Sequence, residues 1–308
     1  MGNVSFSKLD FMNNQLGLIF ITLLRLLGCL PFSMVRSLGA FFGRTIVKRN
    51  RRTVKAIDIN LKLCLPDKTD AERLIIRNKR LEHMGQTALE MSHVWTKSKA
   101  QLITLLNQGN IDNTAFEAAV KAENGVLILA PHLGHWEMMN YYLSQFRPLT
   151  VMYRPIKNSE KLDSFIRKAR ESAGSELAPT NRKGVMQLMK ALKKSGLVGI
   201  LPDQCPQAGG GVYVPFYKQQ AYSMTLASQL ANKTSAKVFI GAALRVKGGY
   251  EVIMEPVDEA FYSDVIEESV ASMNLSIEKI VDRYPDQYQW EYKRFKKQPD
   301  GKSLYPRG

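Results

Sequence analysis

From Val126 onward, short apolar runs alternate with amphipathic segments, and this alternation constrains the fold more than any other feature of the sequence. The pattern predicts strands over 126–130, 149–153, 197–201, 238–244 and 250–254, and helices over about 135–146, 159–173, 182–194, 222–233, 263–283 and 287–296. Gly248 and Gly249 predict a tight hairpin between the last two strands. Residues 50–124 are expected to be helical. Strands alternating with helices are typical of an α/β fold, here a mostly parallel sheet flanked by helices.

The N-terminal region contains two apolar stretches followed by a basic cluster. Leu16–Leu30 is shorter than the roughly 20 residues needed to span a bilayer, and Met34–Val47 contains two arginines. The two stretches are either buried core helices or a membrane-associated hairpin. The second interpretation is favoured because the cluster 48–52 places positive charge where an anionic cytoplasmic surface would attract it. We therefore expect membrane-associating helices over 1–48 and one further domain over 49–308.

The formal net charge of +15 indicates an anionic partner. Nucleic acid, an anionic membrane, a phosphorylated lipid and an acidic carrier protein all fit this charge, as does a merely solvated basic surface. Cys29, Cys64 and Cys205 are odd in number and far apart, so the sequence predicts neither a disulfide framework nor a zinc-binding cysteine pattern. This usage favours a reducing compartment.

A histidine and a glutamate follow the first strand at a spacing that suits catalysis. The apolar run 126–130 stops at Pro131, His132 follows at once, and Glu137 lies five positions later. Residues five apart do not share a helix face, so the pair can meet only if His132 lies on the turn and Glu137 at the start of the next helix. Gly134 permits such a turn. We interpret His132 as a general base and Glu137 as the carboxylate that orients it.

Other chemistries are less well supported. His132, His135 and Glu137 could form a metal trio, but the spacing lacks the paired histidines of the zinc-protease motif and no fourth ligand cluster is evident. We expect neither a metal nor a cofactor. The sequence has no Gly-x-Ser-x-Gly nucleophile elbow. The glycine run 209–211 lacks the P-loop lysine and is interpreted as a mobile loop beside the site.

Several charged residues are placed to meet a ligand. Arg154, Asp203 and Arg245 follow predicted strands, and ligands of parallel sheets bind outside the carboxyl ends of the strands. Arg170 lies in a predicted helix. Each of these residues, taken singly, is at least as well explained by a surface ion pair.

Several separated motifs, in order, resemble those of a known group of enzymes. Pro131–Glu137 fits the His-x4-Asp/Glu motif of the glycerolipid acyltransferase superfamily, and the chain resembles more narrowly the bacterial late acyltransferases of lipid A biosynthesis. The resemblance covers about residues 15–300 and includes Tyr153–Pro155, Arg170–Gly174, Leu201–Gln204, Val214–Phe216, Arg245, Tyr284–Trp290 and Lys293–Phe295.

The resemblance implies a glycerolipid-acyltransferase-like fold and an enzyme at the cytoplasmic face of the inner membrane. Such an enzyme transfers a fatty acyl group from acyl carrier protein to a hydroxyl on an acyl chain of a Kdo-modified lipid A precursor. Residues 49–308 would form the acyltransferase domain, with direct transfer and no acyl-enzyme. Catalysis would rest on His132 and Glu137, and substrate binding, by resemblance, on Arg154, Arg170, Asp203 and Arg245.

Two alternatives remain at this stage. One is an acyltransferase of the same superfamily acting on glycerolipids or lysophospholipids, against which the segment Tyr284–Trp290 argues. The other is a basic protein without catalysis that binds a membrane or nucleic acid. We expect an inner-membrane partner and no nucleic acid.

Overall fold

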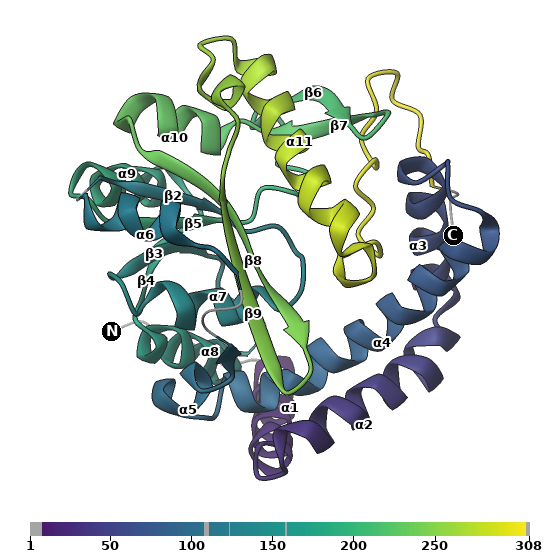
Figure 1. Ribbon diagram of the computed structural model, residues 1–308. Coiled ribbons are helices and arrows are strands. Elements are labelled where there is room, and N and C mark those ends of the chain that lie inside the picture. The colour runs from purple at the N-terminus through teal and green to yellow at the C-terminus, as the bar shows by residue number, and fades with distance from the viewer. Residues whose placement is uncertain (1–7, 108–110, 123, 158, 306–308) are drawn as a thin grey trace.

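A computed structural model describes residues 8–107, 111–122, 124–157 and 159–305 of the chain. Its main feature, within these residues, is a seven-stranded sheet with the order β1-β9-β8-β2-β5-β3-β4 (Figure 1). All neighbouring strands are parallel except β8 and β9, which form an antiparallel hairpin. The strands are β1 Leu106–Asn107, β2 Val126–Leu129, β3 Leu149–Tyr153, β4 Ser175–Pro179, β5 Leu197–Ile200, β8 Lys237–Val246 and β9 Gly249–Pro256. The predicted α/β class and its mostly parallel sheet are confirmed.

Helices cover both faces of the sheet because consecutive residues of a strand point to opposite sides. Leu127 and Leu129 of β2 pack in one core cluster, while Val126 and Ile128 pack in the other. The helices are α1 Lys8–Gly28, α2 Phe32–Thr45, α3 Arg51–Cys64, α4 Asp70–Val94, α5 Lys99–Ile103, α6 Thr114–Lys121, α7 Trp136–Leu143, α8 Glu160–Ala173, α9 Arg182–Lys193, α10 Leu226–Thr234 and α11 Ile266–Arg283. β2 is therefore buried on both faces and is a rigid support for whatever follows it.

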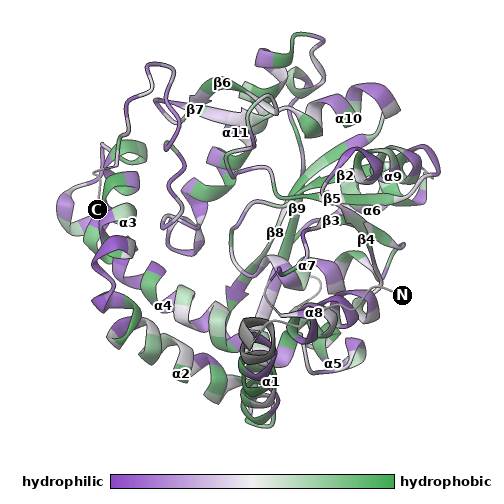
Figure 2. Cartoon of the chain, turned by 180° about the vertical axis from the view of Figure 1, so that it is seen from behind, coloured by the Kyte–Doolittle hydropathy of each residue, from purple (hydrophilic) through white to green (hydrophobic). Residues whose placement is uncertain are grey.

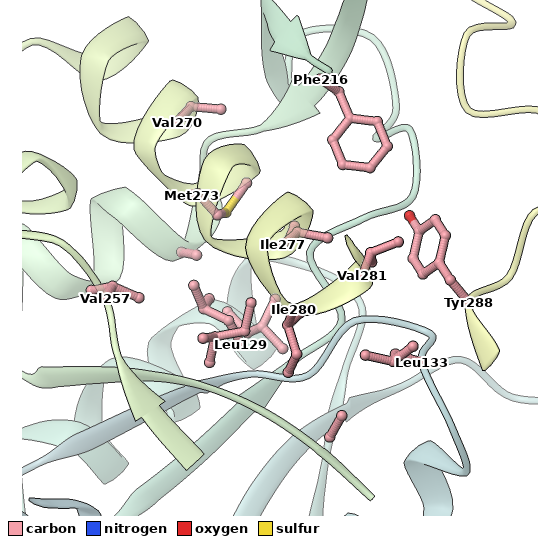
Figure 3. Close-up of a cluster of buried hydrophobic side chains, with 14 of the residues drawn as sticks. Leu129, Leu133, Phe216, Val257, Val270, Met273, Ile277, Ile280, Val281 and Tyr288 are labelled. Atoms are coloured by element: carbon pink, nitrogen blue, oxygen red, sulfur yellow. The ribbon is translucent and has the colours of Figure 1, made fainter. Parts of the chain in front are cut away.

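Helix α11 lies against the first of these clusters. Figure 3 shows its apolar side chains directed toward Leu129 of β2, toward Leu133 just beyond that strand, and toward Tyr288. The buried residues of this contact are each less than 5% exposed: Val270, Met273, Ile277, Ile280 and Val281 on α11, and Leu129, Leu133 and Tyr288. The turn that follows β2 therefore packs against α11 and the segment after it.

The long helix α4 supports α2 along its length (Figure 1). A capping box between Thr69 and Glu72 starts α4. The two helices approach closely because glycines face each other at the crossing. A Cβ on Gly43 would lie 2.1 Å from the Leu81 carbonyl oxygen, and one on Gly85 would lie 2.1 Å from the Gly39 oxygen. Any larger residue at these positions would force the helices apart.

The outer sides of α1 and α2 carry large apolar side chains in contact with solvent. Figure 2 shows α1 as a largely hydrophobic helix at the edge of the molecule. The exposed residues are Leu16, Leu18, Ile19, Phe20, Leu23 and Leu26 on α1, and Met34, Leu38, Phe41 and Phe42 on α2. Among the helices within the described residues, none combines the length and the apolar character that a bilayer crossing requires.

Some sequence predictions differ from the structure. The helix expected over 222–233 begins only at Leu226, because the residues before it belong to β7 Gln219–Met224, which pairs with β6 Gly211–Phe216. The helix expected over 287–296 is wrong. After the short 3₁₀ turn Pro285–Gln287, the chain is irregular because its backbone groups bond to the turn after β2.

Candidate active site

The turn after β2 is held by hydrogen bonds from two distant segments. The Gly134 N–H donates to the Gln287 carbonyl at 3.2 Å, and the His135 N–H donates to the Ala243 carbonyl of β8 at 2.8 Å. Gly134 has φ +63°, and a Cβ there would lie 2.1 Å from the Ala243 oxygen. Only glycine satisfies both conditions. The turn fixes the position of His132, whose carbonyl accepts a hydrogen bond from the Gln289 N–H at 3.0 Å.

We expect Gly134→Ala to lower kcat about tenfold or more and to lower thermal stability. The added Cβ makes the left-handed conformation costly and collides with β8, so the turn must move. Steady-state kinetics well below the melting temperature check this, with Gly209→Ala as control. Gly209 also has a positive φ, but nothing lies within 4 Å of a Cβ there. Equal activity losses in the two variants would contradict the explanation.

His132 is paired with a carboxylate, but the carboxylate is Asp203. Its Oδ1 lies 2.8 Å from His132 Nδ1, and its Oδ2 accepts the His132 backbone N–H at 2.9 Å. The predicted hydrogen bond between His132 and Glu137 is therefore wrong, because the carboxylate that pairs with His132 is Asp203. The reason lies in the sheet: β5 is the parallel neighbour of β2, with Ile200 opposite Leu129, so residues just beyond both strands meet at one edge.

The buried Asp203 remains a carboxylate because of this contact. Burial alone would raise the pKa of its side chain, but the electrostatic attraction of the His132 ring and the hydrogen bonds from that ring and from the His132 backbone hold that pKa below its usual range. With the carboxylate at Nδ1, the ring keeps its proton there. The lone pair of Nε2 then accepts a hydrogen bond from the Gln204 amide at 3.2 Å. The arrangement leaves Nε2 as the basic atom.

Glu137 instead forms an ion pair with Arg170. The Arg170 Nε lies 3.2 Å from Glu137 Oε2, and its Nη2 donates to Oε1. Asn140 contributes a weaker contact to the same carboxylate, at 3.4 Å. The Arg170 guanidinium also lies over the Tyr153 ring, 5.3 Å from its centroid. Helices α7 and α8 thus hold a fixed, nearly buried pair beside His132.

A cavity of about 460 Å³ brings His132, Glu137 and Arg170 together. It runs between α7 and the sheet, and its polar residues gather at the carboxyl edge of the strands. Its apolar lining includes the buried Leu143, Leu149 and Gly199 and the half-buried Val151. The cavity therefore has a polar mouth with a basic nitrogen and an interior suited to a hydrocarbon chain.

The other candidate residues lie in different environments. Arg154 lines the mouth of the cavity and is exposed, and no ion pair within the described residues includes it. Arg245 is buried behind the turn, where it donates to the Gly134 carbonyl at 3.0 Å. His135 is fully buried, and its Nε2 lies 3.8 Å from Glu90 Oε2. No group of three or more metal-binding side chains occurs in the part of the chain that the structure describes.

Sequence reasoning missed the roles of Gln204 and Gln289. Gln204 bridges His132 Nε2 and the Gln289 side chain, with 3.1 Å to the latter. Gln289 belongs to a segment that the sequence singled out only by resemblance, whereas Gln204 also follows Asp203, which the strand pattern placed at the edge of the sheet. The position of Gln204 just after β5 was the available signal for that residue. Nothing in the local pattern near Gln289 indicated the site.

Comparison with known proteins identifies the family of the chain. The profile of the family described as bacterial lipid A biosynthesis acyltransferase matches residues 5–297. The match covers nearly the whole chain and makes this protein an acyltransferase. More narrowly, the chain belongs to the bacterial lipid A biosynthesis acyltransferase family.

Curated relatives match over similar lengths. The chain is 26% identical to a lipid A biosynthesis lauroyltransferase of Escherichia coli strain K12, over 88% of each chain. It is 25% identical to a lipid A biosynthesis palmitoleoyltransferase of the same organism, over 89% of each chain. It is 28% identical to a lipid A biosynthesis acyltransferase of Haemophilus influenzae, over 90% of this chain and 89% of the relative.

Proposed function

We propose that this protein transfers a fatty acyl group from acyl carrier protein to a hydroxyl on an acyl chain of a Kdo-modified lipid A precursor. The reaction takes place at the cytoplasmic face of the inner membrane. The observation that carries the proposal is the His132–Asp203 pair, placed at the polar mouth of an apolar cavity. A base next to a hydrocarbon pocket is what transfer of a long acyl chain to a hydroxyl requires.

In the proposed mechanism, His132 acts as the general base. Its Nε2 exchanges the Gln204 contact for the acceptor hydroxyl and takes the proton as the oxygen attacks the thioester carbonyl. The tetrahedral intermediate collapses with loss of the carrier thiolate, and the imidazolium returns the proton to that sulfur. Asp203 retains the Nδ1–H throughout and stabilises the imidazolium. No acyl-enzyme forms.

Glu137 and Arg170 act on the acyl donor, whose thioester carbonyl is attacked. The developing negative charge on the thioester oxygen needs a positive or hydrogen-bonding group nearby. Arg170 reaches the cavity, and Glu137 fixes its direction. Backbone N–H groups at the start of α7 offer a second source of stabilisation. Glu137 thus serves catalysis through Arg170.

Charge and exposed apolar surface support the proposed partners. Arg154 at the cavity mouth and a net charge of +15 suit an acidic carrier protein and a phosphorylated acceptor. The exposed leucines and phenylalanines of α1 and α2, followed by the basic cluster 48–52, suit residues 1–48 to an anionic membrane surface. Residues 49–308 would carry the catalytic site.

The test is an assay with purified protein, acyl carrier protein thioesters of several chain lengths and a Kdo-modified lipid A precursor in detergent or anionic vesicles. Mass spectrometry should show the acceptor heavier by one acyl group. A parallel reaction supplies glycerol 3-phosphate and a lysophospholipid as acceptors. Acylation of these acceptors alone would replace the proposal with the glycerolipid alternative, and acylation of none would overturn it.

We expect Gly199→Leu to shift the preferred acyl donor toward chains shorter by roughly two to four carbons. Gly199 lines the cavity, and a Cβ there would lie 3.1 Å from Val151, so a larger side chain fills space that the acyl chain would use. Each methylene of the acyl chain that no longer fits the cavity loses about 0.8 kcal/mol of burial, which lowers the rate of acyl transfer roughly fourfold. Competition between donors of different length measures the shift. Activity with the shortest donor is the internal control, and an unchanged length profile would contradict the placement of the chain.

A further inference from the structure

A fully buried carboxylate, Glu90 of α4, lies directly behind the catalytic turn. Its Oε2 accepts from Arg245 Nε at 2.8 Å, and its Oε1 accepts from Arg36 Nε at 2.8 Å. Burial alone would raise the pKa of Glu90, but the charges of Arg245 and Arg36 and the hydrogen bond from Arg245 lower that pKa to about 2. A charged group of this kind, bonded on both oxygens, fixes the direction of each arginine that it binds.

Arg245 uses its remaining donors to hold the turn. Its Nη1 donates to the Gly134 carbonyl at 3.0 Å, and its Nη2 donates to Thr87 Oγ1 at 2.5 Å. The Arg245 backbone exchanges two hydrogen bonds with the Gln287 side chain, at 2.8 and 3.1 Å. Gln287 in turn accepts the Gly134 N–H. Both polar backbone groups of Gly134 therefore depend on this cluster.

Arg36 connects the cluster to the N-terminal helices. Its Nη1 and Nη2 donate to the carbonyls of Val246 and Gly249, at 2.6 and 3.0 Å, across the β8–β9 turn. Its guanidinium also lies over the Phe32 and Tyr250 rings, 4.6 and 5.0 Å from the centroids. Glycines hold α2 close to α4, so the backbone that carries Arg36 is fixed relative to the helix that carries Glu90.

We propose that Arg36, Glu90 and Arg245 are positioning residues that set the place of His132 through the Gly134 carbonyl. This inference rests on the proposed function of the site. It means that α2 contributes to catalysis as well as to membrane contact, through a chain of hydrogen bonds from α2 through α4 and β8 to the catalytic turn. Arg245 itself touches neither the cavity nor the reacting atoms.

The arrangement is built for orientation more than for stability. Buried ion pairs contribute little net stability, since desolvation offsets their attraction. A planar guanidinium, however, donates in several fixed directions at once, which an ammonium cannot do. Arg245→Lys therefore keeps the charge beside Glu90 and loses the simultaneous bonds to Thr87 and Gly134.

The experiment compares Arg245→Lys, Glu90→Gln and Arg36→Lys with a matched control, Arg147→Lys. Arg147 also donates to several backbone carbonyls, among them Asn124 and Ser195, but at the opposite end of the sheet. Arg36, Glu90 and Arg245 with their hydrogen bonds to the Gly134 turn are called the relay. We expect the three relay variants to lower kcat 10- to 100-fold with KM within threefold, at a temperature far below melting. Amide hydrogen exchange of peptides covering 131–137 should become faster in each. The control should lower the melting temperature and keep kcat and this exchange unchanged.

The outcomes separate the relay from the proposed reaction. If Arg245→Lys keeps kcat within twofold, or if Arg147→Lys loses as much activity, the relay is overturned. If the wild-type protein transfers no acyl group, the proposed reaction fails and hydrogen exchange alone decides the relay, with unchanged exchange in the folded variants counting against it. Should Arg245→Lys fail to fold, Glu90→Gln and Arg36→Lys decide by the same measurements.

Discussion

Replacement of His132 by alanine is expected to lower kcat by about 10³-fold or more while leaving the melting temperature within a few degrees of wild type. The acceptor hydroxyl is a poor nucleophile until a base removes its proton, and His132 Nε2 is the basic atom at the cavity mouth. The side chain is part-exposed, so its removal leaves no large apolar void. Initial rates with a saturating thioester donor measure the loss.

His132→Gln provides the matched control for this prediction. Glutamine retains a polar side chain of similar reach but no basic nitrogen, so kcat should fall as far as in the alanine variant. Binding of the thioester donor, measured by titration, should stay within about threefold in both. Near-native turnover in either variant would remove His132 from the mechanism.

Asp203→Asn is expected to lower kcat by roughly 10²- to 10³-fold, more than Glu137→Gln does. The amide cannot accept both the ring Nδ1–H and the backbone N–H of His132 as a charged group does, so the imidazolium formed during attack loses its partner. Glu137→Gln acts through Arg170, and we expect a loss of roughly tenfold. Kinetics of the two single variants and the double variant measure the difference.

Comparison of the single and double variants also shows whether Asp203 or Glu137 is the carboxylate that acts together with His132. In the arrangement described here, Asp203→Asn and His132→Ala act on one unit, so combining them should cost little more than His132→Ala alone. Glu137→Gln and Arg170→Gln should likewise be non-additive with each other. If Glu137→Gln proves as damaging as His132→Ala and Asp203→Asn is mild, Glu137 must approach His132 during turnover.

Local sequence patterns were sufficient for much of the fold. The parallel sheet, the β8–β9 hairpin and the helix after β2 follow from apolar periodicity and glycine placement, because these depend on neighbours along the chain. The partner of His132 could not be found in this way. Asp203 reaches His132 only because β5 lies beside β2, and strand order is a property of the whole sheet.

The same reasoning explains the failed helix over 287–296. Its periodicity favoured a helix, yet the Gln287 carbonyl and the Gln289 N–H are used by the turn around His132. In a helix over 287–296, the Gln287 carbonyl would instead have accepted the N–H of Glu291. Tertiary hydrogen bonds therefore override local propensity at the positions nearest the site.

The dependence of the His132 turn on residues 287–289 has a consequence for how the protein matures. A growing polypeptide contains the base and β2 long before it contains the backbone groups that bond to His132 and Gly134. We therefore expect the site to remain unformed until residues 287–289 have been synthesised. A premature stop before this segment would yield a product with every proposed catalytic side chain and no organised active site, so incomplete chains would leave membrane lipids unmodified.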